Sequence, residues 1–93
     1  MIQVDRIYIV TRFYISITGS NSNGDSDCEV FCEKRKAEQL FHKWHDEELD
    51  CRKESDCGYE IYIDTYEKFH CSWDDDKEMV FIALTEQELK KPI

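Results

Sequence analysis

The sequence predicts an α+β domain in which one long amphipathic helix packs on an antiparallel sheet. Three observations favour this class. Apolar side chains alternate with a period of two over residues 7–17, recur at helical spacing over residues 33–52, and form an unbroken run over residues 79–84. The chain has 93 residues with one proline and three glycines, a length that holds one modest hydrophobic core. Residues 1–93 are therefore expected to form a single domain.

The first half of the chain is expected to form a hairpin followed by the helix. Residues 7–17 are typical of a long strand, residues 19–27 are rich in turn formers, and residues 28–32 predict a short returning strand. Glu48 points into the apolar stripe of the helix, which indicates that the helix is looser or ends near this residue. The stripe itself consists of Ala37, Leu40, Phe41, Trp44 and Cys51.

The second half is expected to add two or three further strands. Alternation resumes over residues 59–73, which predicts either one bent strand or two strands, and residues 73–77 form a polar turn. The apolar run 79–84 is typical of a central strand buried on both faces. Thr85-Glu86-Gln87-Glu88 fits a capping box, so a short C-terminal helix is expected to begin at Thr85 and to stop before Pro92.

Charge is distributed unevenly along the chain. There are 21 acidic and 12 basic residues, and the formal net charge is -9. Residues 1–45 hold six of each sign, so the whole excess lies in residues 46–93. Such a field repels nucleic acid and anionic lipid and attracts a protein partner with a basic surface, although solubility alone also explains it. The chain shows no signal sequence or membrane span, and its five cysteines favour reduced thiols in the cytoplasm.

Patterns for metal binding and catalysis are weak. Cys28-x3-Cys32 and His42-x2-His45 are separated by nine residues, whereas a zinc finger separates such pairs by about twelve. We expect the two cysteines to lie in the core and the two histidines to be solvated. No nucleophile elbow, phosphate loop or zinc-protease motif is present. The sequence therefore predicts a protein that is not an enzyme and has no catalytic residues, bound metal or cofactor.

Protein recognition is the function class that the residues favour. If the helix covers the odd-numbered face of the sheet, tyrosines and carboxylates share the other face with Val10, and this composition is typical of a contact patch. Two other interpretations stay open: the tyrosines stabilise the sheet by cross-strand pairing, or the same face forms a homodimer. The expected partner-binding residues are Tyr8, Tyr14, Glu60, Tyr62, Asp64, Tyr66, Asp74, Asp75, Asp76 and Glu78.

The chain resembles the small acidic α+β proteins of phages and mobile elements, several of which are anti-CRISPR or other anti-defence inhibitors. The resemblance lies in length, charge, element order and the strand-to-helix stretch EVFCEKRKAE at residues 29–38. It implies a stoichiometric inhibitor of a nucleic-acid-binding bacterial effector, whose carboxylates replace phosphates.

Two other function classes remain. The alternative is a small homodimeric structural or regulatory module that is acidic only for solubility, and a zinc- or thiol-based protein is the third class. Salt separates the first two classes, because a phosphate-mimicking complex weakens as ionic strength rises and an apolar dimer hardly responds.

Overall fold

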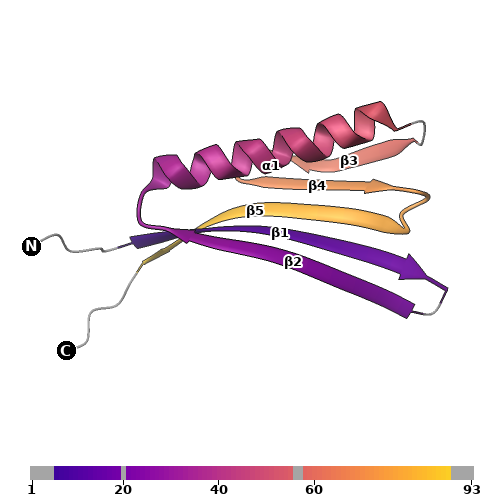
Figure 1. Cartoon of the computed structure of the whole chain (residues 1–93), viewed down its shortest axis with the longest axis horizontal. Helices are drawn as coiled ribbons and strands as arrows, with labels where there is room; N and C mark the ends of the chain where they lie inside the picture. Colours follow the sequence, from indigo (N-terminus) through magenta and orange to yellow (C-terminus); the bar gives the residue numbers. More distant parts are fainter. Residues whose placement is uncertain (1–5, 20, 56–57, 89–93) are drawn as a thin grey trace, which may run out of the picture.

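The computed structural model describes residues 6–19, 21–55 and 58–88, with the backbone alone for residues 21–23. Within these residues the strands form one antiparallel sheet in the order β2-β1-β5-β4-β3, accompanied by one helix (Figure 1). The elements are β1 (Arg6–Thr18), β2 (Asn21–Phe31), α1 (Lys34–Glu54), β3 (Tyr59–Asp64), β4 (Lys68–Trp73) and β5 (Glu78–Glu88). The α+β class, with an antiparallel sheet and one long helix, is confirmed.

Strand β1 is paired along both of its edges, with β2 on one side and β5 on the other. Val10, for example, lies opposite Glu29 on β2 and opposite Leu84 on β5. Directly opposed residues of antiparallel strands point to the same face of the sheet. The even-numbered residues of β1 therefore share a face with the even-numbered residues of β5 and the odd-numbered residues of β2.

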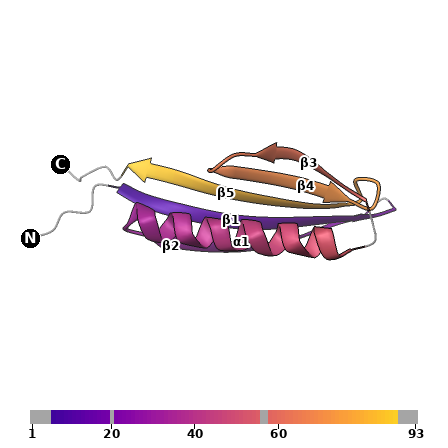
Figure 2. The same cartoon turned by 90° about the horizontal axis from the view of Figure 1, so that it is seen from above.

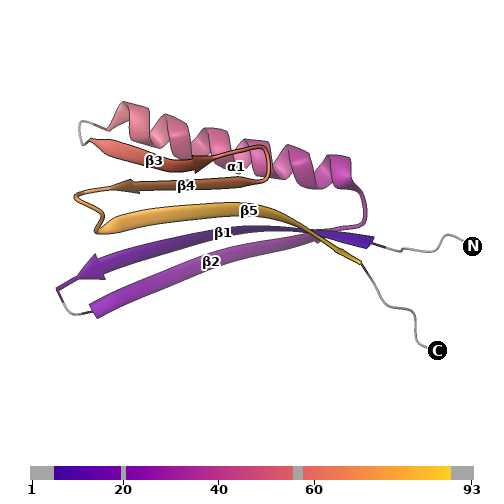
Figure 3. The same cartoon turned by 180° about the vertical axis from the view of Figure 1, so that it is seen from behind.

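The helix covers this even-numbered face of β1. Figure 2 shows α1 on one side of β1 and β5, and in Figure 3 no helix of the described chain lies in front of the opposite face. The prediction of a central strand in the apolar run 79–84 is confirmed, since β5 is the middle strand. The expected burial of that strand on both faces is wrong, because Phe81 is only half-buried on the uncovered side. The buried core consists of Val10, Ala37, Phe41, Trp44, Phe69, Cys71, Val80, Ile82 and Leu84.

The predicted short helix from Thr85 is wrong, because β5 continues as a strand to Glu88. Its last residues pair with the beginning of β1, and Arg6 Nη1 lies 2.9 Å from Glu86 Oε1. A helix here would have to give up the backbone hydrogen bonds of this ladder. Backbone pairing with the long β1 therefore determines the conformation of residues 85–88, although their local sequence fits a capping box.

The hairpin between β1 and β2 is tighter than predicted. The loop expected over residues 19–27 is largely strand, because β2 begins at Asn21 and pairs with β1 as far as Phe31. Its polar composition is compatible with an edge strand, whose outer side is not paired within the described sheet. Gly19 has a φ of 63°, a left-handed conformation that glycine adopts without strain in so tight a turn.

Residues 59–73 form two strands rather than one bent strand. The turn between β3 and β4 is held by Thr65, whose hydroxyl accepts hydrogen bonds from the backbone N–H groups of Glu67 and Lys68 at 3.3 and 3.0 Å. The pairing of β3 with β4 shifts between Ile61 and Ile63, which marks a β-bulge. Strand β3 is therefore a short, irregular edge of the sheet.

The helix does not loosen or end near Glu48, contrary to the sequence expectation. Glu48 is buried between α1 and the sheet at 6% exposure, and the helix continues to Glu54. The Tyr14 hydroxyl donates a hydrogen bond to Glu48 Oε2. Arg12 Nη1 lies 3.5 Å from the same oxygen, and Arg52 Nη1 lies 3.8 Å from Oε1. The carboxylate is thus compensated by three partners.

The two guanidinium groups are also packed on aromatic rings. The Arg12 carbon Cζ lies 4.6 Å from the Trp44 ring centroid, and that of Arg52 lies 3.6 Å from the Trp73 centroid. Burial and the neighbouring Glu48 carboxylate raise the pKa of Tyr14, so its hydroxyl remains a donor at neutral pH. We define Arg12, Tyr14, Glu48 and Arg52 as the polar cluster. It ties the second half of α1 to β1.

We expect Glu48→Ala to lower the free energy of unfolding by about 2–4 kcal/mol, because two partly buried guanidinium groups and a tyrosine lose their shared acceptor. Chemical denaturation measures the change. The matched control is Glu47→Ala, which removes an exposed carboxylate 3.4 Å from Arg12 and should cost less than about 1 kcal/mol. Equal, small losses in the two variants would contradict the anchoring role of Glu48.

Candidate interaction surfaces

The tyrosine face predicted from the sequence is not open. An open tyrosine face requires that α1 cover the odd-numbered face of β1, and the structure places α1 over the even-numbered face instead. Val10 is fully buried there, and Tyr8 and Tyr14 pack against the core. Glu78 lies on the same side, half-buried, and its carboxylate accepts a hydrogen bond from Ser16 at 2.8 Å. Tyr8, Tyr14 and Glu78 are thus separated from the other predicted contact residues.

The remaining predicted contact residues lie along β3 and in the turns near its two ends. Tyr66 is 75% exposed and Tyr62 is 49% exposed. Asp64 Oδ1 lies 3.0 Å from His45 Nε2, a contact that joins β3 to α1. We call these seven residues the acidic edge: Glu60, Tyr62, Asp64, Tyr66, Asp74, Asp75 and Asp76.

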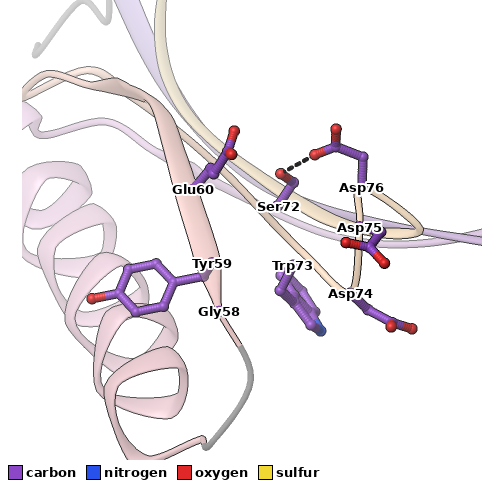
Figure 4. Close-up of a pocket in the computed structure, with 8 residues that line it drawn as sticks. All are labelled: Gly58, Tyr59, Glu60, Ser72, Trp73, Asp74, Asp75 and Asp76. Carbon is purple, nitrogen blue, oxygen red and sulfur yellow. Dashed lines mark hydrogen bonds between the residues drawn. The ribbon is translucent and has the colours of Figure 1, made fainter.

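The turn between β4 and β5 carries three successive aspartates in left-handed conformation, with φ of 56°, 55° and 63°. Hydroxyl groups of Ser72 and Tyr62 donate hydrogen bonds to Asp76, and they hold the pKa of this carboxyl below its usual range. The turn borders an open depression of about 600 Å³, and Figure 4 shows the residues that line it. Its lining residues are Gly58, Tyr59, Glu60, Ser72, Trp73, Asp74, Asp75 and Asp76.

The opposite, odd-numbered face of β1 is the surface that sequence reasoning missed. We call it the open face and define it by the side chains that β1, β2 and β5 present away from α1. Phe13 lies opposite Phe81 on β5, and Ile9 lies opposite Val30 on β2. Val30 is 58% exposed and Phe13 is 40% exposed. The open face carries Ile7, Ile9, Thr11, Phe13, Ile15 and Ile17 from β1, Gly24, Ser26, Cys28 and Val30 from β2, and Met79, Phe81, Ala83, Thr85 and Gln87 from β5.

None of these described open-face positions is charged, although 35% of all residues in the chain are charged. The other side of the same three strands is rich in charge. It carries Arg6, Arg12, Asp25, Asp27, Glu29, Glu78, Glu86 and Glu88. The sequence contains the signal for this segregation, since the odd positions of β1 are almost all β-branched or aromatic.

At the centre of the open face, aromatic side chains contact residues of the neighbouring strands. The Phe13 ring leans over Gly24 on β2, where a Cβ atom would lie 3.1 Å from Phe13 Cζ. On β4, the next strand beyond β5, the His70 ring stacks on Phe81 with centroids 3.9 Å apart. The Tyr62 ring centroid lies 5.0 Å from that of His70. A band of rings therefore crosses the sheet from β1 to β3.

Of the cysteines and histidines considered for zinc, His42 is exposed as expected, and the other three residues lie elsewhere than expected. Cys28 and Cys32 are exposed rather than in the core. His45 is half-buried rather than solvated, with its ring nitrogens 3.1 Å from Asp46 and 3.0 Å from Asp64. Among the described residues no group of three or more histidine, cysteine or acidic side chains has a geometry for a metal ion. Nor does α1, the helix of the described chain, have the apolar length needed to cross a membrane.

We expect His70 to make stability depend on pH. Burial lowers the pKa of His70, and the charge of Asp76 only partly opposes this. His70 therefore binds a proton more readily in the unfolded chain than in the folded chain. Its contribution to the free energy of unfolding is fully present above about pH 6.5 and is lost as the pH falls towards the folded-state pKa. Denaturation at several pH values should show a weaker acid loss in His70→Phe, which keeps the ring stack. The exposed His42→Phe control should keep the slope of the natural chain, and identical slopes in all three proteins would contradict the role of His70.

Comparison with known proteins found no matching family model, no similar curated protein and no similar solved structure. The described chain has two candidate interaction surfaces with different chemistry: the uncharged open face and the acidic edge.

Proposed function

We propose that this chain is a non-enzymatic protein-binding module that contacts its partner through the open face. The carrying observation is the absence of charge from the described open-face positions of three adjacent strands. Depletion of charged residues with enrichment of aromatic and aliphatic ones is the composition of the buried centre of a protein interface. Contiguous apolar patches of this kind are uncommon on monomeric proteins.

The pattern differs from that of an ordinary solvated sheet. An antiparallel sheet with one face in water normally alternates apolar residues on the covered side with polar residues on the other. In β1 the uncovered positions include Ile9, Phe13 and Ile15, and in β5 they include Met79 and Phe81. Both strands have the composition of strands covered on both sides, and a protein partner would supply the second cover.

We expect Val30→Glu to abolish partner binding, because it buries a carboxylate in an apolar contact. Ile61→Glu is the matched control, since Val30 and Ile61 are both exposed β-branched residues on edge strands, at 58% and 42%. Ile61 lies opposite Cys71, on the side of the sheet away from the open face. Affinity capture from bacterial lysate, in the presence of a differently tagged copy of the chain, measures binding.

A protein retained by the natural chain and by Ile61→Glu, but lost with Val30→Glu, would support the open face as the contact surface. A second copy of the chain counts as such a protein. Equal retention by both variants, or no specific retention by the natural chain, would contradict the proposal. Circular dichroism establishes that each variant is folded.

A second candidate function uses the acidic edge as a mimic of nucleic-acid phosphates, so that the chain inhibits a nucleic-acid-binding effector. The observation in its favour is that two exposed tyrosines, Tyr62 and Tyr66, stand among five carboxylates on β3 and the adjacent turns. Carboxylates on a folded scaffold attract lysine and arginine, and tyrosines provide contacts that exclude water. The partner in this case has a basic surface.

Replacing Asp74, Asp75 and Asp76 together by asparagine tests the second candidate. Asparagine tolerates left-handed backbone as aspartate does, so the turn is retained while three charges are removed. We expect binding to a basic effector to weaken severalfold, and binding by the natural chain to weaken as salt rises. Unchanged affinity in the folded triple variant, or affinity independent of salt, would contradict this function.

A further inference from the structure

We infer that a second copy of this chain occupies the open face, so that two sheets pack face to face around a two-fold axis. This inference rests on the proposed function and names the partner. The two helices would lie on the outside, giving four layers in the order helix, sheet, sheet, helix.

The absence of charged side chains distinguishes the open face from the other described surfaces through which two copies could associate. Each copy has a net charge of -9, and like charges brought together oppose association. The open face is the described surface of β2, β1 and β5 on which no charged side chain is present. Two copies that meet there keep the described carboxylates of β2, β1 and β5 on the helix side, away from each other, while Glu60 and Asp76 lie at the margin of the contact.

The open face is large enough to form the centre of a standard dimer interface. At about 3.3 Å per residue and about 4.8 Å per strand, β2, β1 and β5 present a rectangle of about 36 by 14 Å. That plan area is about 500 Å², and β4 adds its neighbouring strip. Side-chain relief raises the accessible area above the plan area, to the order of the 800 Å² per partner that standard interfaces bury.

The thickness of the molecule shows why the second cover has to come from outside the described chain. The principal extents are 53 × 28 × 17 Å, and 17 Å accommodates one sheet and one helix. Two sheets pack at about 10 Å when their inner faces are apolar. A copy of the same open face offers a surface of the same length, the same strand twist and the same absence of charge.

Pairing of two copies through sheet edges is less favourable. On β2 the described residues Asp25, Asp27 and Glu29 would face acidic residues of the other copy in a two-fold antiparallel pair. On β3, Glu60 and Asp64 belong to a short strand that contains the bulge. Both edges therefore carry features that oppose strand addition, whereas the open face has none.

Among the described open-face side chains of β2, β1 and β5, Cys28 is the titratable one. Charged groups meet the open face at its margin with β4 and β3. Lys68, His70, Glu60 and Asp76 are found there, and Asp76 is already engaged by Tyr62 and Ser72. Interfaces commonly have an apolar centre and a polar rim. The centre of the contact is accordingly assigned to Phe13, with β4 at its rim.

Sedimentation equilibrium of the purified chain over a wide concentration range tests the inference. We expect the natural chain to have twice the 11.2 kDa mass of one copy. Val30→Glu and Ile17→Glu should have the mass of one copy, and Ile61→Glu should keep the doubled mass. Ile17 and Ile61 are closely matched, at 37% and 42% exposure. Added salt should leave the dimer unchanged or tighten it, because it screens repulsion between two acidic copies.

Cysteine alkylation provides a second readout that needs no substitution in the interface. Cys28 lies on the open face, opposite Thr11, and Cys51 is exposed on α1. Dilution below the dissociation constant should speed the alkylation of Cys28 and leave that of Cys51 unchanged, as peptide mass spectrometry can follow. This comparison keeps the inference testable if an open-face variant does not fold.

A natural chain with the mass of one copy at every concentration would overturn the second copy as the partner. The proposed function would survive that result if a different protein were captured through Val30, and it would fail as well if nothing were captured. A doubled mass that persists in Val30→Glu and Ile17→Glu, with Cys28 alkylated at the same rate at all concentrations, would place the dimer contact elsewhere and overturn the inference.

Discussion

The double pairing of β1 is the interaction on which the rest of the molecule depends. This 13-residue strand carries β2 on one edge and β5 on the other, and the register on both edges decides which side chains share a face. Once Val10 and Leu84 lie on one side, Phe13 and Phe81 must lie on the other. The single helix of the described chain covers one side only. An apolar surface without a cover is therefore a direct result of strand pairing and of the small number of layers.

The polar cluster explains how the helix is held on the side that it covers. A helix that packs by apolar contacts alone can slide or rotate, whereas the buried Glu48 carboxylate has to meet Tyr14 and Arg12 of β1 to avoid a large desolvation cost. These partners lie on the even-numbered face of β1. Tyr14, which the sequence analysis assigned to an exposed contact patch, is thus one of the residues that hold the helix on this face. Cation–π contacts of Arg12 and Arg52 with two tryptophans reinforce the arrangement.

Local patterns predicted the class of fold because they are set by short-range periodicity. The alternation around Ile9 and the stripe through Phe41 each reflect contacts within one element, and both are present in the structure. What the sequence could not supply is the choice of face. Both faces of β1 carry aromatic and aliphatic residues, and the choice between them depends on long-range contacts such as those of Glu48 with Tyr14 and Arg12. The strand ending at Glu88 was missed for a related reason, since a capping box is a local signal and the ladder with Arg6 connects residues far apart in the chain.

The two candidate surfaces are compatible within one assembly, because the acidic edge lies along β3 and the turns near its ends, beyond the centre of the open face on β1 and β5. Face-to-face packing would bury Phe13 and Val30, while Tyr66 and the aspartate turn would remain at the outer margins of each sheet. A two-fold axis would then present two acidic edges, one from each copy. When a partner has two basic sites, binding of the first edge gives the second edge a high effective concentration at the other site, so two edges on one rigid scaffold bind more tightly than one edge. If both proposals hold, loss of the dimer should weaken acidic-edge binding without removing any carboxylate. The affinity of the two acidic edges for their partner then depends on the uncharged contact between the two open faces.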